Sequence, residues 1–321
     1  IVQPTPVRMV YLDLVLQAYR DLYGETMPAD AWGVHSFILR EATCAAFPDS
    51  CWGSDVPPGV DVTHGELYEV DQADDLQIFQ DRILEFREWM ASWGYREIPL
   101  LITEYSSWMP DHGTYEGWDQ ARTKVFLYGT FDYLLTATDS EYGYPPDENR
   151  LVQRWLWYSL DDEEYGGFLY NQYTADPRTI AQDFGAYTSA ISPTVDLYAV
   201  SVRQVEPVPY SPTQPVTITL RGRVANVGNI PVTQSVVVRF YDEGGVQIGA
   251  DQVITGPIGG CADFREATVA WPNVSPGAHS VRMAVDQDGT IDEKTVANNE
   301  VTGTALVATD RVFLPLVSRS S

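Results

Sequence analysis

The sequence predicts an α/β region followed by an all-β region, and three observations support this division. Up to residue 190, amphipathic segments alternate with short apolar runs, which is the rhythm of an α/β layer. From Val195 onward, apolar residues recur at every second position, as in half-buried strands. The formal net charge of -25 is also uneven, because residues 1–190 hold 32 acidic and 11 basic side chains, whereas residues 191–321 hold 13 and 9.

The first predicted helix covers residues 7–24 and stops at Gly24, a residue suited to a helix C-terminus. Its periodicity places five residues on the face expected to be buried: Tyr11, Leu14, Val15, Ala18 and Leu22. The short apolar run over residues 30–38 then predicts a strand.

A second helix, over residues 71–94, leads directly into the run Leu100, Leu101 and Ile102. This run lacks alternation, which favours a parallel strand covered on both faces. Glu104 stands at the end of that strand. A carboxylate there is costly unless it is used or paired, so Glu104 is the residue to explain.

A third helix is predicted over residues 118–138, and a third strand within residues 151–160. The residues expected to face inward on that helix are Ala121, Val125, Tyr128, Phe131 and Leu135. Asp176 and Pro177 predict an N-cap and first turn for a fourth helix. Its expected core positions are Ile180, Phe184 and Tyr187.

The all-β region contains seven strand candidates separated by glycine-containing and proline-containing turns. They cover residues 195–202, 216–227, 232–241, 246–254, 265–271, 278–285 and 300–307. Seven short strands in this length of chain predict an immunoglobulin-like β-sandwich. The apolar tail, residues 309–321, is expected to dock on the protein, with a sorting or anchoring signal as the alternative.

Composition excludes two classes of partner. An acidic surface without a Lys/Arg cluster repels phosphate backbones, so nucleic acid is not expected to bind. No apolar run approaches the ~18 residues that a membrane-spanning helix needs, so no transmembrane segment is predicted. The chain begins at Ile1 rather than Met, and we expect it to be processed, trimmed or incomplete at this end.

Cys44 and Cys51 are close enough in sequence to close a small ring, so a local disulfide and two buried thiols are both open. Cys261 is left over in either case.

Polar and aromatic residues gather at the ends of the predicted parallel strands, where α/β barrels place their active sites. The candidates are His35, Glu104, Tyr105, Trp157 and Asp161, with Trp108 as a loop residue that could line a cleft. Rings stack on the C–H faces of sugars, and carboxylates accept hydroxyl hydrogen bonds or attack the anomeric carbon. The pattern therefore favours carbohydrate as the ligand.

Structural alternatives stay open for several of these residues. Glu104 could be a carboxylate paired with an arginine, His35 a hydrogen-bonded core histidine, and Trp157 a packing residue. The acidic run from Asp161 to Glu164 favours a solvated loop over a metal site.

The order of these motifs resembles the last three strands of clan-A glycoside hydrolases, whose barrels are (β/α)₈. The matching segments are Val34-His-Ser-Phe37, Leu101-Ile-Thr-Glu-Tyr105 and Trp155-Leu-Trp-Tyr158. The resemblance covers residues 1–191 and implies the C-terminal part of a barrel. It implies Glu104 as the nucleophile of a retaining enzyme, His35 as the histidine near it, and Trp157 as the floor of the sugar site.

One part of the family's pattern is missing. Its acid/base glutamate lies in an Asn-Glu pair on an earlier strand, and no such pair precedes His35. A retaining mechanism needs two carboxyl groups about 5–5.5 Å apart, and Glu41 is a weak substitute for the second one. We therefore expect the chain to be inactive by itself, with further polypeptide completing the barrel or with self-assembly.

Residues 192–308 resemble the CARDB type of bacterial extracellular adhesion module. The matching residues are Val195-Asp-Leu197, Arg223 to Asn229, Ala284-Val-Asp286, Glu293 and Asn298-Asn-Glu300. The resemblance implies a place outside the cell or at the cell surface. Residues 286–292 alternate oxygen ligands before a glycine like a calcium loop, but an acidic hairpin turn is the alternative, and no other cofactor or metal is expected.

The sequence thus predicts a secreted carbohydrate-active protein that acts on an oligo- or polysaccharide, with Glu104 as the nucleophile. The alternative is a non-enzymatic extracellular surface, filament or adhesion subunit built from a barrel remnant and a sandwich. An unpaired apolar strand edge near residues 32–38 would support assembly.

Overall fold

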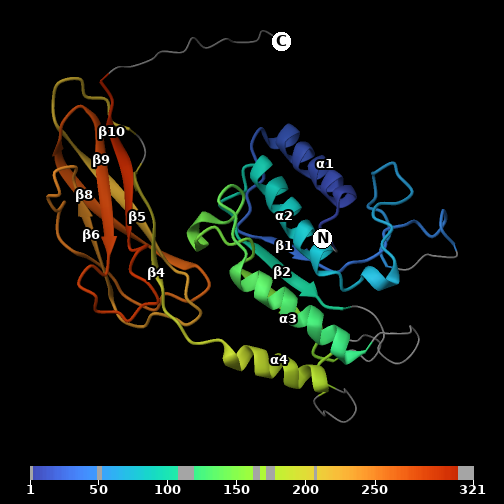
Figure 1. Ribbon diagram of the computed structural model, residues 1–321. Coiled ribbons are helices and arrows are strands. Elements are labelled where there is room, and N and C mark those ends of the chain that lie inside the picture. The colour runs from blue at the N-terminus through green and yellow to red at the C-terminus, as the bar shows by residue number, and fades with distance from the viewer. Residues whose placement is uncertain are drawn as a thin grey trace, which may run out of the picture. The chain divides into compact units, whose positions relative to one another are not determined.

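The structure is a computed structural model that describes residues 3–48, 53–107, 119–161, 167–170, 178–205 and 208–309. It consists of two compact units, Ile1–Ser192 and Pro193–Ser321 (Figure 1). Trp108, Cys51 and the apolar tail from residue 310 onward lie outside the described residues.

The first unit is an α/β region with a three-stranded sheet in the order β1-β2-β3. Both strand pairs are parallel. Its elements are α1 (Pro6–Tyr23), β1 (Trp32–His35), the 3₁₀ helix η1 (Val70–Gln72), α2 (Leu76–Ser92), β2 (Leu100–Tyr105), α3 (Gln120–Thr136), the 3₁₀ helix η2 (Pro145–Asp147), β3 (Arg154–Trp157) and α4 (Thr179–Ala190). A partial barrel was expected. In the described residues, the three strands instead form an open parallel sheet, and no barrel is seen.

One face of this sheet packs against helices and the other is uncovered by the described residues. In β1, Trp32 packs edge-on against Phe86 and Trp89 of α2, whereas Gly33 between the buried positions is exposed. In β3, the alternate residue Leu156 is 64% exposed. Side chains alternate across a strand, so the exposed positions share the second face. In β2, where cover on both faces was expected, Leu101 is half-buried and Thr103 is exposed, so the described residues cover the second face only in part.

The apolar face predicted for α1 is wrong. The helix ends as expected, with Gly24 in a left-handed conformation at φ 76°. Its buried residues, however, are Leu12 and Leu16, while Leu14 and Leu22 are 51% and 77% exposed. Asp13 explains this orientation, because its carboxylate accepts hydrogen bonds from two indole N–H groups of α2 at 2.7 Å.

Helix α3 is also turned relative to the prediction. Val125 is 74% exposed, whereas Phe126 and Leu127 are buried. Of the inward positions expected for this helix, Phe131 is buried. In α4, the predicted core residue Ile180 is fully buried and Phe184 and Tyr187 pack against the same core.

Charged side chains are buried inside the α/β unit. Arg87 of α2 is 0% exposed and donates to the carbonyl oxygens of Leu151 and Ile98 and to Oε1 of Gln153. Burial lowers the pKa of Arg87 to about 9. Its three acceptors tie α2 to the segments before β2 and β3, so Arg87 fixes the positions of these elements.

The second unit is a β-sandwich of seven strands. They are β4 (Leu197–Gln204), β5 (Val216–Asn226), β6 (Val236–Tyr241), β7 (Gln252–Ile254), β8 (Asp263–Val274), β9 (Gly277–Val285) and β10 (Glu300–Val307). They form one sheet in the order β10-β9-β6-β7 and another in the order β4-β5-β8. Alternate residues of both sheets build one apolar core, as the period-two pattern predicted.

The structure gives the oxidation state of two of the three cysteines. Cys44 is disulfide-bonded, in agreement with the first alternative, although its expected partner lies outside the described residues. Cys261 is free and half-buried.

Candidate functional site

The structure brings two predicted site residues together at the carboxyl ends of neighbouring parallel strands. His35 ends β1 and Glu104 lies near the end of β2, and the two are register partners across an irregularity in the pairing. His35 Nδ1 lies 3.2 Å from Glu104 Oε2. Their side chains are 32% and 39% exposed. The pair is therefore accessible from solvent at the edge where parallel α/β sheets place ligands.

Burial sets the charge state of His35. Partial burial lowers its pKa below the ordinary value of 6.5, although the neighbouring Glu104 carboxylate opposes this shift. At neutral pH the imidazole is therefore predominantly neutral and can donate to, or accept from, a hydroxyl group. Glu104 is paired with a histidine rather than with the arginine that its structural alternative required.

Two aromatic residues extend this site, and sequence analysis did not select them. Phe37 lies edge-on to His35 at 6.3 Å between ring centroids, and Tyr158 lies edge-on to Phe37 at 5.7 Å. The sequence did contain a signal for Tyr158. Successive side chains of a strand point to opposite faces, so Tyr158 is expected on the face opposite to its neighbour Trp157.

Tyr105 and Trp157 lie on the opposite, helix-covered side of the sheet from this group. Tyr105 is 0% exposed and packs against Phe79 of α2. Trp157 contacts Tyr105 and Phe131 of α3. Both rings are part of the helix-side core. Their predicted contact with a sugar stays a prediction, and in this conformation their contacts are those of packing residues.

The remaining candidates do not join the pair. Asp161 is exposed beyond β3, and Trp108 is outside the described residues. Glu41 is 0% exposed and its Oε1 accepts a 2.7 Å hydrogen bond from Arg8. A buried carboxylate held in this way is structural, so Glu41 does not fill the place of the missing acid.

Two hydroxyl groups next to Glu104 in sequence are unusual. Ser106 and Ser107 are 1% and 0% exposed, and each side-chain oxygen is buried without a hydrogen-bond partner. A buried hydroxyl without a partner costs free energy. The two serine hydroxyl groups just after β2 therefore make no hydrogen bonds with the described residues.

The acidic loop of the second unit is a hairpin turn. Asp286 accepts hydrogen bonds from the backbone N–H groups of Thr290 and Ile291, and Asp288 pairs with Arg239. Within the described residues, no group of three or more His, Cys, Asp or Glu side chains could hold a metal ion.

The second unit matches a known family. The sequence model of the CARDB family aligns with residues 194–303. These residues form a CARDB domain. Among curated proteins, none matches the chain. Neither the family match nor the search of curated proteins specifically supports a glycoside hydrolase barrel in the α/β unit.

Solved CARDB structures cover the same part of the chain. A CARDB domain from Pyrococcus furiosus, determined in complex with di-metal ions, is 21% identical, with a TM-score of 0.31. The alignment covers 38% of this chain and all of that one. A domain from a protein assigned to the cell surface of Methanosarcina acetivorans is 20% identical, with a TM-score of 0.29, over 36% of this chain and 95% of that one.

No helix within the described residues is both long and apolar enough to cross a membrane.

Proposed function

We propose that this protein is a non-enzymatic extracellular subunit of a cell surface, whose α/β unit assembles with a second copy of the chain. The observation that carries this proposal is the uncovered surface of the α/β unit. Parallel sheets are normally buried on both faces, yet here one face and the outside of α1 are exposed. The CARDB domain supports a surface location.

The assembly surface is the outer face of α1, which we define as Val10, Leu14, Val15, Ala18 and Leu22. Four of these side chains are large and apolar and are 38–77% exposed. Burying one such side chain contributes about 1.5–3 kcal/mol. In a two-fold arrangement, the α1 helices of two copies would cover each other.

Sedimentation velocity over a range of protein concentrations tests this assembly. We expect concentration-dependent dimers that the double variant Leu14→Glu, Leu22→Glu weakens on the order of a hundredfold. The control is Val125→Glu, which places one such charge at an exposed apolar position of α3 and is compared with Leu14→Glu alone as well as with the double variant. A monomer at every concentration, or equal weakening by Val125→Glu and Leu14→Glu, would contradict the proposal.

A second candidate function is favoured by the Glu104–His35 pair. In this account the α/β unit supplies the nucleophile of a retaining glycosidase, and further polypeptide supplies the acid. A carboxylate at the end of a parallel strand, with a neutral imidazole 3.2 Å away, is suited to attack an anomeric carbon.

A fluorinated glycoside with a dinitrophenolate leaving group tests this role without the acid. Glu104 would form an ester bond to the anomeric carbon while the bond to the dinitrophenolate breaks, and that anion leaves without protonation. Mass spectrometry would then find one added sugar on Glu104. The label should be absent in Glu104→Gln and retained in Glu97→Gln, an exposed glutamate before the same strand. Failure to label a panel of such sugars would reject the enzyme and leave the surface subunit.

A further inference from the structure

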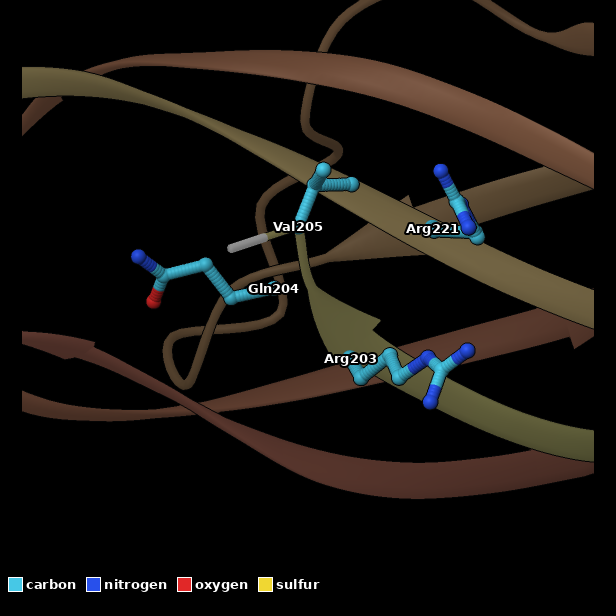
Figure 2. A pocket seen from close by; sticks show the side chains of 4 residues that line it. All are labelled: Arg203, Gln204, Val205 and Arg221. Atoms are coloured by element: carbon cyan, nitrogen blue, oxygen red, sulfur yellow. The ribbon is translucent and has the colours of Figure 1, made fainter. Parts of the chain in front are cut away.

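We propose that the CARDB domain binds a carboxylate-bearing saccharide in a pocket at the end of β4. Figure 2 shows this pocket, which is lined by Arg203, Gln204, Val205 and Arg221 and has a volume of about 300 Å³. The site belongs to the sandwich alone. It is therefore independent of Glu104 and of the assembly surface.

Two arginines face each other across the strands at this pocket. Arg203 of β4 and Arg221 of β5 are register partners in an antiparallel pair. Figure 2 shows both side chains on one side of the view, whereas Gln204 extends to the other. Directly opposed residues have their Cβ atoms about 4.5–5.5 Å apart, and like charges at this position repel each other.

These two arginines are less fully paired than other arginines of the domain. Arg239, Arg265 and Arg282 each form an ion pair of 2.9 Å or less with an acidic side chain. The Arg203 side chain forms no ion pair or hydrogen bond with the described residues. An anionic ligand bound between Arg203 and Arg221 would therefore offset the repulsion between their positive charges.

Glu266 neutralises only part of this charge. Its Oε2 lies 3.5 Å from Arg221 Nε, and its Oε1 accepts a hydrogen bond from Arg223 at 3.3 Å. One carboxylate is therefore shared by two arginines. Arg221 Nε is buried, and its 3.5 Å contact with Glu266 is too long and misaligned to count as a hydrogen bond.

The remaining lining residues fit a sugar acid rather than a bare ion. The Gln204 side-chain oxygen accepts a 2.7 Å hydrogen bond from the Leu306 N–H, while its amide nitrogen is buried without an acceptor. Val205 adds an apolar wall for the C–H face of a ring. The guanidinium fork binds planar carboxylates through two hydrogen bonds.

Isothermal titration of the full chain with trigalacturonate at low ionic strength tests this site. We expect binding that Arg203→Gln weakens about tenfold or more. Arg203→Lys, which keeps the charge but not the fork, should also weaken it. Arg282→Gln, which removes an equal charge elsewhere on the sandwich, should have little effect.

Two further ligands separate the contributions of carboxylate and sugar. Neutral maltotriose should not bind, and acetate should bind at least tenfold more weakly than trigalacturonate. Absence of trigalacturonate binding, equal binding of maltotriose or acetate, or an Arg203→Gln affinity equal to the wild type would overturn the proposal. The thermal unfolding of each variant verifies its fold.

Discussion

The two units of this chain bury their apolar surfaces in different ways. In the sandwich, two antiparallel sheets face each other, and Val236, Val238 and Phe240 of β6 are 0% exposed. In the α/β unit, the single sheet packs on helices at one face only, and Leu14 and Leu156 are more than half exposed. Two sheets close a core by themselves, whereas three parallel strands need further cover.

The units also differ in what their cores contain. The sandwich core is a continuous apolar cluster. In the α/β unit, Arg87, Glu41 and Asp147 are each 0% exposed and engaged in polar contacts. Buried charged side chains fix the positions of the helices and strands that they join, but removing one partner leaves the other buried and unpaired, which is strongly destabilising. The α/β unit should therefore be the one that single polar substitutions disturb most.

The largest predicted effects separate the two cores. Arg87→Met leaves three buried acceptors without their donor and should lower the free energy of unfolding of the α/β unit by about 3–5 kcal/mol. Phe240→Ala should lower that of the sandwich by a similar amount, about 3–5 kcal/mol. Calorimetry should show that each variant shifts a different unfolding transition. A single transition shifted equally by both would mean that the units unfold together.

A smaller contrast lies within α1. Leu16→Ala removes a side chain that is 2% exposed and should cost about 2–5 kcal/mol. Leu14→Ala should change the stability of the monomer by less than about 0.5 kcal/mol, because this side chain is half exposed. Urea unfolding at low protein concentration measures both. Equal losses would show that the outer face of α1 is covered within one chain.

The N-cap of α2 provides a local test, for which the expected loss of stability is about 1 kcal/mol. Asp75 accepts hydrogen bonds from the backbone N–H groups of Gln77 and Ile78, as an N-cap does. Asp75→Ala should lower the free energy of unfolding of the α/β unit by about that amount, and Asp75→Ser should restore most of it. A larger loss in both variants would point to a contact beyond the cap.

The smallest effect is the titration of His35. Its pKa is lowered in the folded chain, so its stabilising contribution is complete above the unfolded value of about 6.5 and is lost as pH falls through the folded value. Glu104→Gln removes an influence that raises this pKa, so it should lower the pKa further. Proton NMR of the imidazole measures this shift, with His279 as the internal control. A rise in the His35 pKa would contradict the observed pairing.

Sequence patterns predicted where helices and strands occur in the chain better than they predicted which side chains of α1 face inward. The period-two runs of the sandwich fix which side chains face inward, because each strand has one apolar face. In α1, however, apolar residues occur on several sides, so Leu14 and Leu16 cannot be ranked without knowing that Asp13 binds two indoles of α2. Glu104 and His35 were predictable from their places at strand ends. The alternation along β3 hinted at Tyr158, but its contact with Phe37 required the three-dimensional order β1-β2-β3 of the sheet.

Hydrogen exchange at increasing protein concentration tests the central claim, that the outer face of α1 forms an assembly surface. The account predicts that protection rises with concentration in residues 6–23 and stays constant in residues 236–241 of the sandwich. The rise should disappear in Leu14→Glu, Leu22→Glu. Protection that is independent of concentration in residues 6–23, or that rises in the sandwich instead, would contradict it.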